Sequence, residues 1–273
     1  MTQTITASTP ELPEVPPSPQ ASNWVDVIGL ALAFSAAAAM FFWTWAKWCD
    51  VLVDFGRELY VPWQLALGKV LYRDIAYFNG PLSPYLNSLW FRFFGPSFHA
   101  LATWNVLILG AIIWLLYEVL RTISSSVAAI AAILSFVGIF AFGQYEFVGN
   151  YNYIGPYSHE LTHGMALSLA ALYFLRLYLR SRRPAHLFAV GVAAGLVFLT
   201  KPEIFIALAC AITAAMAVML WRPDTESSRW RSVALVIAGA ITPPLITFVL
   251  LTMAMPAAEA EKYFARRGWV CSP

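Results

Sequence analysis

Charged side chains are scarce in this sequence of 273 residues. They make up 12% of it, whereas hydrophobic residues make up 60%. A soluble domain has about 25% charged residues, so the composition excludes an ordinary soluble protein and indicates an integral membrane protein. The net charge is only +2 and no long basic run occurs, so no nucleic acid is expected as a partner.

Cysteines, repeats and an N-terminal basic segment are also few or absent. Cys49, Cys210 and Cys271 form no CxxC pair, so neither a disulfide framework nor a zinc site is predicted. No internal repeat suggests an inverted-repeat transporter. Residues 1–23 contain five prolines and no Lys or Arg, so they lack the basic start of a signal peptide and are predicted to form a disordered cytoplasmic tail.

Long apolar runs are what the sequence contains instead. A span needs about 20 apolar residues, and seven runs are candidates: 27–46, 101–120, 127–142, 161–179, 187–200, 203–221 and 233–255. We therefore predict an all-α, polytopic transmembrane helical bundle of about seven spans over residues 24–255. Runs 187–200 and 203–221 are either one kinked span or, as we prefer, a tight helical hairpin.

The short loops between these runs differ in charge. Those on one side hold eight arginines, whereas those on the other side hold only Lys201. The positive-inside rule then puts the Arg-rich side in the cytoplasm and the long loop 49–99 outside. An amphipathic segment starts after Met255 and is not followed by a further apolar run. We therefore expect residues 256–273 to be an external tail of a truncated chain.

The stretch 50–95 is the one long segment that is neither apolar nor low in complexity. It is rich in Gly, Pro, Tyr and Trp, which predicts turns and short helices at the membrane–water interface. One of them is expected over residues 84–94. A polar loop of this kind is where a membrane enzyme would carry its chemistry.

Asp54 and Glu58 in this loop are the first candidate catalytic residues. On one helix they would share a face, and Asp54 would serve as a general base for an acceptor hydroxyl. The alternative is that Asp54 only caps a helix or pairs with Arg57.

Lys201 lies between two apolar runs, where an ionisable residue is a functional hypothesis. Its compact charge suits a phosphate. The alternative is a turn lysine that reaches the surface and pairs with Glu203.

A third polar region ends in His159, Glu160 and His163. The pattern is HExxxH rather than the HExxH of metalloproteases. We therefore favour polar groups that line a cavity, with a two-histidine metal site as the weaker alternative. No metal site is assigned, and a divalent metal is left open as a cofactor.

Four motifs together resemble a known family. They are D-x-G-R-E-L from Asp54, P-W-Q-L-x-x-G-K-V-L-Y-R-D from Pro62, F-N-G-P-L-S-P-Y-L-N from Phe78 and T-K-P-E from Thr200. The pattern resembles GT-C glycosyltransferases, the polyprenol-phosphate-sugar-dependent membrane enzymes that include protein O-mannosyltransferases and the lipid A aminoarabinose transferase. The resemblance covers residues 24–255.

This resemblance implies an inverting transfer of a sugar from a polyprenyl-phosphate donor to a hydroxyl of a lipid, glycan or protein, on the outer face of a bacterial inner membrane. Asp54 matches the family's catalytic acid, although many members have two adjacent acids and Phe55 follows here. Glu58 is the second catalytic candidate. Basic groups would neutralise the departing phosphate. The candidates for substrate and phosphate binding are Lys201, Arg57, Arg73, Tyr85, His159 and Glu160.

Two other functions remain open at this point. One is a non-catalytic membrane protein, either a transporter subunit or a lipid binder, and the other is an inactive fragment of such a transferase. A transporter would place its polar groups at mid-membrane. The polar groups of this chain lie at the ends of the predicted spans, which favours the enzyme.

Overall fold

The computed structural model describes residues 23–45, 47, 55–143, 152–221 and 226–255. This part of the chain is built from helices, as predicted. In chain order they are α1 (Asn23–Trp43), α2 (Gly56–Ala66), α3 (Leu82–Phe94), α4 (Phe98–Leu120), α5 (Ser126–Ser135), the π-helical turn η2 (Phe136–Ala141), α6 (His159–Ser181), α7 (Pro184–Phe198), α8 (Pro202–Trp221) and α9 (Glu226–Ala254).

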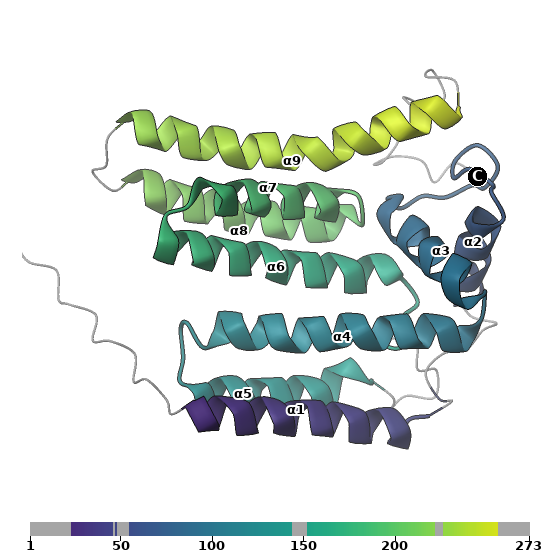
Figure 1. Ribbon diagram of the computed structural model, residues 1–273, viewed down its shortest axis with the longest axis horizontal. Coiled ribbons are helices and arrows are strands. Elements are labelled where there is room, and N and C mark those ends of the chain that lie inside the picture. Colours follow the sequence, from purple (N-terminus) through teal and green to yellow (C-terminus); the bar gives the residue numbers. More distant parts are fainter. Residues whose placement is uncertain (1–22, 46, 48–54, 144–151, 222–225, 256–273) are drawn as a thin grey trace, which may run out of the picture.

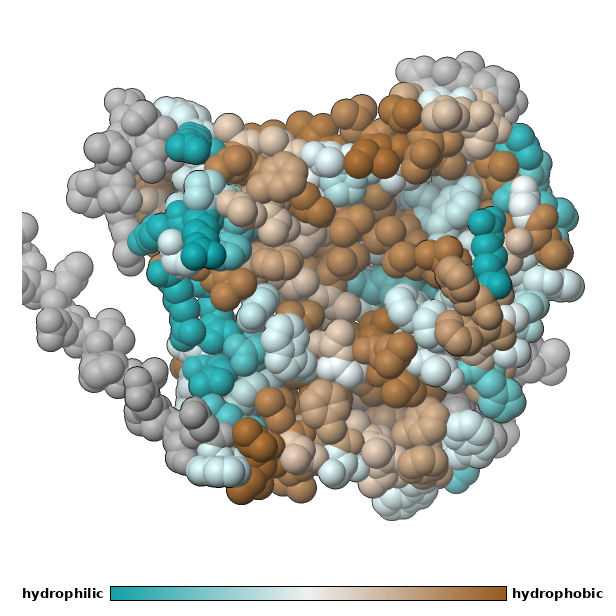
Figure 2. Space-filling model, in the orientation of Figure 1, coloured by the Kyte–Doolittle hydropathy of each residue, from teal (hydrophilic) through white to brown (hydrophobic). Residues whose placement is uncertain are grey.

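Most of these helices run side by side along one direction, and α2 and α3 lie together at one end of them (Figure 1). We call this the loop end; it also holds residues 152–158 and 199–201. The opposite end, which holds the turns 121–125 and 182–183, is the Arg-rich end. On the visible face, hydrophilic side chains gather toward both ends, and hydrophobic ones cover much of the middle (Figure 2).

Four described helices are long and apolar enough to cross a membrane, over residues 24–43, 98–120, 202–221 and 230–254. The chain is therefore an all-α membrane protein. The predicted runs 127–142 and 187–200 form helices that are shorter than a full span, α5 with η2 and α7. Run 161–179 lies within α6 and is not among the four, because its polar residues lower the hydropathy. Seven spans therefore stay a prediction.

The predicted hairpin over residues 187–221 is confirmed. Helix α7 ends at Phe198 and α8 begins at Pro202, and the turn between them places Thr200 and Lys201 at the loop end. Proline suits the first position of α8, where a missing N–H leaves no bond unmade.

Helix α9 covers α7 through backbone-close packing. A Cβ atom on Gly191 would lie 2.2 Å from the Val236 carbonyl oxygen, and one on Gly239 would lie 2.3 Å from the Phe188 oxygen. Small residues allow helices to approach closely in a membrane, where the hydrophobic effect does not drive them together.

A charged cluster joins α1, α4 and α6 at the Arg-rich end. The Arg121 guanidinium lies 2.9 Å from the Asp26 carboxylate and 3.8 Å from that of Glu118. The Tyr117 hydroxyl donates to Asp26 at 2.6 Å, and Arg176 pairs with Glu118. Each carboxylate of this Arg-end cluster therefore faces an arginine.

The helix predicted over residues 84–94 is confirmed as α3. Its apolar side chains Leu89, Phe93 and Phe94 are exposed, while the polar Ser83 and Asn87 are buried against the rest of the protein. An exposed aromatic face suits a helix that lies in a membrane interface, although this placement stays a prediction.

Candidate functional site

The loop between α2 and α3 is docked on the turn between α7 and α8. The Gly80 amide donates to the Thr200 carbonyl at 2.8 Å, and the Leu82 amide donates to the Leu199 carbonyl at 3.1 Å. The Tyr72 hydroxyl donates to the Asn79 carbonyl at 2.7 Å and so stabilises the conformation of the same loop. These bonds bring together two of the motifs found in the sequence, F-N-G-P and T-K-P-E.

Glu58 projects from the first turn of α2 into the interior. Its carboxylate accepts a hydrogen bond from His159 Nδ1 at 2.6 Å, one from the His159 backbone amide at 3.1 Å and one from Arg57 Nη2 at 2.8 Å. Burial alone would raise the pKa of Glu58, but the hydrogen bond from His159 and the Arg57 guanidinium outweigh it and lower the pKa. Glu58 is therefore held as a carboxylate.

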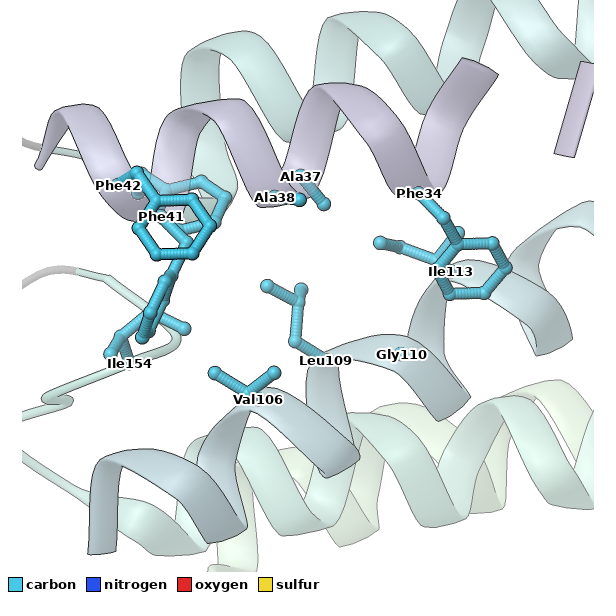
Figure 3. Close-up of a pocket in the computed structure, with 11 residues that line it drawn as sticks. Phe34, Ala37, Ala38, Phe41, Phe42, Val106, Leu109, Gly110, Ile113 and Ile154 are labelled. Atoms are coloured by element: carbon cyan, nitrogen blue, oxygen red, sulfur yellow. The ribbon is translucent and has the colours of Figure 1, made fainter. Parts of the chain in front are cut away.

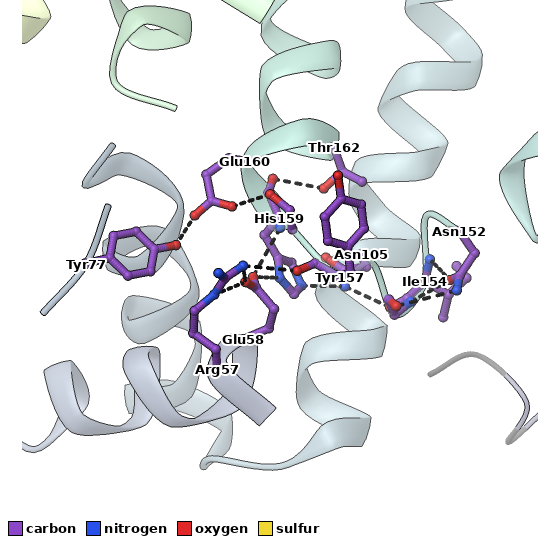
Figure 4. Close-up of polar contacts among 12 residues, drawn as sticks. Arg57, Glu58, Tyr77, Asn105, Asn152, Ile154, Tyr157, His159, Glu160 and Thr162 are labelled. Atoms are coloured by element: carbon purple, nitrogen blue, oxygen red, sulfur yellow. Dashed lines mark hydrogen bonds and ion pairs between the residues drawn. The ribbon is translucent and has the colours of Figure 1, made fainter. Parts of the chain in front are cut away.

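The hydrogen bonds of His159 fix the orientation of its ring. Asn105 Nδ2 lies 3.0 Å from His159 Nε2 and also donates to the Ile154 carbonyl at 2.8 Å. The reversed Asn105 amide would set two oxygens against each other, so its nitrogen is the donor and Nε2 is the acceptor. Nδ1 of the ring therefore faces Glu58, and Nε2 faces Asn105 (Figure 4).

Glu160 is a second buried carboxylate beside this pair. It accepts hydrogen bonds from the Tyr77 hydroxyl and, at 2.6 Å, from Ser158 Oγ. Burial and the negative charge of Glu58 raise its pKa. Two carboxylates whose pKa values are pushed in opposite directions are a mark of functional sites.

Two cationic side chains, Arg57 and Lys201, contact Tyr157. Arg57 Nη2 donates to the Tyr157 carbonyl at 3.2 Å, and the Lys201 ammonium lies 5.8 Å from the centre of the Tyr157 ring. Lys201 forms no ion pair with Glu203 in the described chain, so the alternative proposed for it from the sequence is wrong in this respect. Both cations are partly exposed.

Two other candidate residues, Arg73 and Tyr85, stabilise the loop between α2 and α3. Arg73 pairs with Asp74 at 2.9 Å and donates to the Ala254 carbonyl at the end of α9. The Tyr85 hydroxyl accepts from the Leu71 amide at 3.3 Å. These bonds tie the 67–81 loop to α3 and α9. Asp54, the sequence-predicted base, lies outside the described residues.

Several buried polar atoms near His159 have no hydrogen-bond partner in the described part of the protein. They include both ring nitrogens of His163, Trp104 Nε1 and Asn105 Oδ1. The His163 ring centre lies 6.0 Å from that of His159 and 6.4 Å from that of Trp104. The α4–α6 interface therefore retains unused hydrogen-bonding capacity next to the Glu58–His159 pair.

No group of three or more His, Cys, Asp or Glu side chains in the described ranges is arranged to hold a metal ion. Both ring nitrogens of His159 are also occupied by Glu58 and Asn105. The two-histidine metal site needs one free nitrogen from each ring and stays an untested alternative.

Sequence reasoning missed Asn105, Tyr77 and Tyr157. The sequence did contain a signal for Asn105, because a lone polar amide inside the apolar run 101–120 suggests a functional residue by default. The two tyrosines had none beyond the aromatic content of their segments, since interface anchors have the same residue type.

The sequence matches a known family. The model of the family described as dolichyl-phosphate-mannose-protein mannosyltransferase matches residues 79–249, which is more than half of the chain. No curated protein and no solved structure matches the sequence.

Proposed function

Since the chain belongs to the dolichyl-phosphate-mannose-protein mannosyltransferase family, whose members are membrane glycosyltransferases that use polyprenyl-phosphate sugars, we propose that it transfers a sugar from such a donor to an acceptor hydroxyl at the loop end. The transfer inverts the configuration of the sugar. The loop end faces the outer side of a bacterial inner membrane.

The observation that carries this proposal is the docking of F-N-G-P on the T-K-P-E turn. It holds the T-K-P-E turn at the loop end, where the Lys201 ammonium lies over the Tyr157 ring and Arg57 donates to the Tyr157 carbonyl. Partly exposed cations suit an anionic ligand. Arg57 can offer the guanidinium N–H groups that Glu58 and Tyr157 do not use, and Lys201 can offer a point charge, to the same phosphate.

The reaction would proceed in one displacement. The acceptor oxygen forms a bond to the anomeric carbon of the sugar while the bond from that carbon to the phosphate oxygen breaks. The electron pair leaves with the polyprenyl phosphate, and the acceptor proton passes to a carboxylate base. Lys201 and Arg57 would stabilise the charge that develops on the leaving phosphate.

Asp54 is the proposed base, and Glu58 is proposed as a positioning residue. Glu58 has a lowered pKa and four hydrogen-bond donors, and its side chain is 4% exposed. A carboxylate held in this way is a weak base with little access to an acceptor. It instead fixes the positions of Arg57 and His159. Glu160 and Tyr77 are hydrogen-bonded to each other beside this pair.

The test is a transfer assay with the full chain in lipid vesicles. The donor is polyprenyl-phosphate mannose, with other polyprenyl-phosphate hexoses in parallel, and the readout is release of polyprenyl phosphate together with a labelled acceptor. We expect turnover with one donor. Donor binding with neither transfer nor phosphate release would contradict the proposal and favour the lipid-binder alternative.

The orientation has its own test in intact cells. In a background without the three native cysteines, Leu67→Cys at the loop end and Ile123→Cys at the Arg-rich end are matched probes, since both side chains are exposed. A membrane-impermeant thiol reagent should label the first and spare the second. The opposite pattern would place the site in the cytoplasm.

A further inference from the structure

An apolar pocket of about 180 Å³ lies between α1 and α4 (Figure 3). Small residues on both helices create the hollow: Ala37 and Ala38 on α1, and Gly110 on α4. A Cβ atom on Gly110 would lie 3.7 Å from the Phe34 ring, so even a methyl group would fit there. The pocket is therefore a consequence of which side chains face each other, and larger ones would close it.

The pocket lies between two helices that are apolar and long enough to cross a membrane. The rings of Phe34 and Phe42 at its border are exposed, so it opens on the flank that the bilayer would cover. A dry cavity of roughly 150 Å³ lined by apolar side chains takes a six-membered hydrocarbon ring. This one is of similar size and would hold about one isoprene unit.

Shape, rather than hydrophobicity, decides which chain enters. The bilayer interior is as apolar as the pocket, so burial in the pocket gives no hydrophobic gain over the bilayer. The gain comes from van der Waals contacts, which depend on fit. A flat, branched isoprene unit fills a short hollow between phenyl rings and small residues better than a straight methylene chain does.

One short segment connects the pocket to the candidate site. The Ile154 side chain lines the pocket, while its carbonyl accepts from Asn105, the residue that donates to His159. Asn152 Oδ1 fixes this turn by accepting from the Ile154 and Gly155 amides. Tyr157, three residues further on, carries the contacts of Arg57 and Lys201.

We propose that the pocket between α1 and α4 binds an isoprene unit of the donor's polyprenyl chain, while the phosphate of the same lipid lies at Arg57 and Lys201. The proposal rests on the proposed function, because it takes the donor to be a polyprenyl phosphate. It adds the place where the chain is held.

The experiment uses binding rather than turnover. Polyprenyl phosphate without a sugar, with a photoreactive diazirine on an isoprene unit near the phosphate, is added to the full chain in phosphatidylglycerol vesicles. After illumination the adduct is mapped by mass spectrometry. We expect adducts within residues 34–42 and 106–113, and we expect unlabelled polyprenyl phosphate to compete, whereas additional phosphatidylglycerol does not.

Variants test the hollow itself. Ala38→Leu fills it, and Ala39→Leu adds the same bulk at the next exposed position, which does not line the pocket. We expect Ala38→Leu to lower the adduct yield about tenfold, because the leucine side chain would occupy the space that the isoprene unit needs. Ala39→Leu should leave the yield unchanged. Gly110→Val is a second filling variant from the facing helix.

Two results would overturn the proposal: adducts that lie elsewhere, and equal competition by phosphatidylglycerol, which would make the pocket a general lipid groove. The two proposals fail separately. Adducts in the pocket without any sugar transfer would refute the proposed function alone, and transfer without adducts in the pocket would refute the chain site alone.

Discussion

The two ends of the bundle each hold a cluster of two carboxylates, tyrosine and nearby cations, yet the ion pairs and hydrogen bonds within the two clusters differ. At the Arg-rich end, Arg121 bridges Asp26 and Glu118, and Arg176 adds a second cation. Charge is balanced there, and the cluster ties three helices together. Both carboxylates of this cluster are therefore paired with an arginine.

At the loop end, Arg57 pairs with Glu58, whereas Glu160 accepts from the hydroxyl groups of Tyr77 and Ser158, and the Lys201 ammonium lies over the Tyr157 ring. A histidine without exposed surface bridges α2 and α6. We propose that the same residue types serve two purposes: the cluster at the Arg-rich end is a structural clamp, and the cluster at the loop end is a place for a charged substrate. The predictions below test this distinction, from the largest effect to the smallest.

The largest effect is expected for Asp54→Asn. This change keeps the shape of the side chain and removes its basicity, so turnover should fall about 10²-fold or more, as for loss of a general base. Donor binding should persist. The matched control is Asp50→Asn, four residues earlier in the same loop, which should leave turnover within a few-fold. If both variants keep full turnover, the assignment of Asp54 as the base is refuted.

Glu58→Gln and Glu118→Gln make the same change at the two ends. At Glu58 the lost charge frees Arg57 and weakens the bond to His159, so we expect about a tenfold loss of turnover together with a loss of stability of roughly 1.5–3 kcal/mol, the worth of a charged hydrogen bond. At Glu118 we expect loss of stability with normal turnover per folded molecule. Thermal unfolding and transfer assays measure both, and equal activity losses would refute the distinction.

His159→Phe and His163→Phe compare two buried histidines one helical turn apart. The first leaves Glu58 and Asn105 without their shared partner, which costs about 1–3 kcal/mol for each unsatisfied group. The second removes a ring whose nitrogens have no partner in the described structure, so the melting temperature should stay the same or rise. A lower melting temperature for His163→Phe would show that the ring has a partner after all.

The smallest effect is a pH dependence of stability with opposite signs for the two buried glutamates. The raised pKa of Glu160 means that its contribution is complete below its ordinary value of 4.5 and is lost as pH rises through the folded-state pKa. The lowered pKa of Glu58 means that its contribution is present above 4.5 and is lost as pH falls through the folded-state value. Relative to Glu160→Gln, the wild type should lose stability above pH 4.5, and relative to Glu58→Gln it should lose stability below it. Parallel curves would contradict both assignments.

The sequence predicted elements that depend on local signals. The hairpin around Thr200 and the helix α3 follow from Pro and Gly at their borders, and Lys201 was identified because it interrupts an apolar run. The pairing of Glu58 with His159 could not be predicted in the same way, since the two are 101 residues apart and nothing local fixes which helices meet. Arg73 was predicted from its type and position alone. Its bonds to Asp74 and to the Ala254 carbonyl at the end of α9 add a structural role, and the bond across 181 residues had no local signal.

The most direct test of the central claim removes one cation from each end. Lys201→Met and Arg121→Met both exchange a long cation for an unbranched apolar side chain, and each variant is measured for sugar transfer per folded molecule and for melting temperature. We predict that Lys201→Met lowers transfer about tenfold or more, through weaker donor binding or slower phosphate departure, and leaves the melting temperature nearly unchanged. Arg121→Met should lower the melting temperature and leave transfer intact, because it breaks a clamp. The reverse pattern, or equal losses of transfer in both variants, would contradict the assignment of the loop end as the site of chemistry.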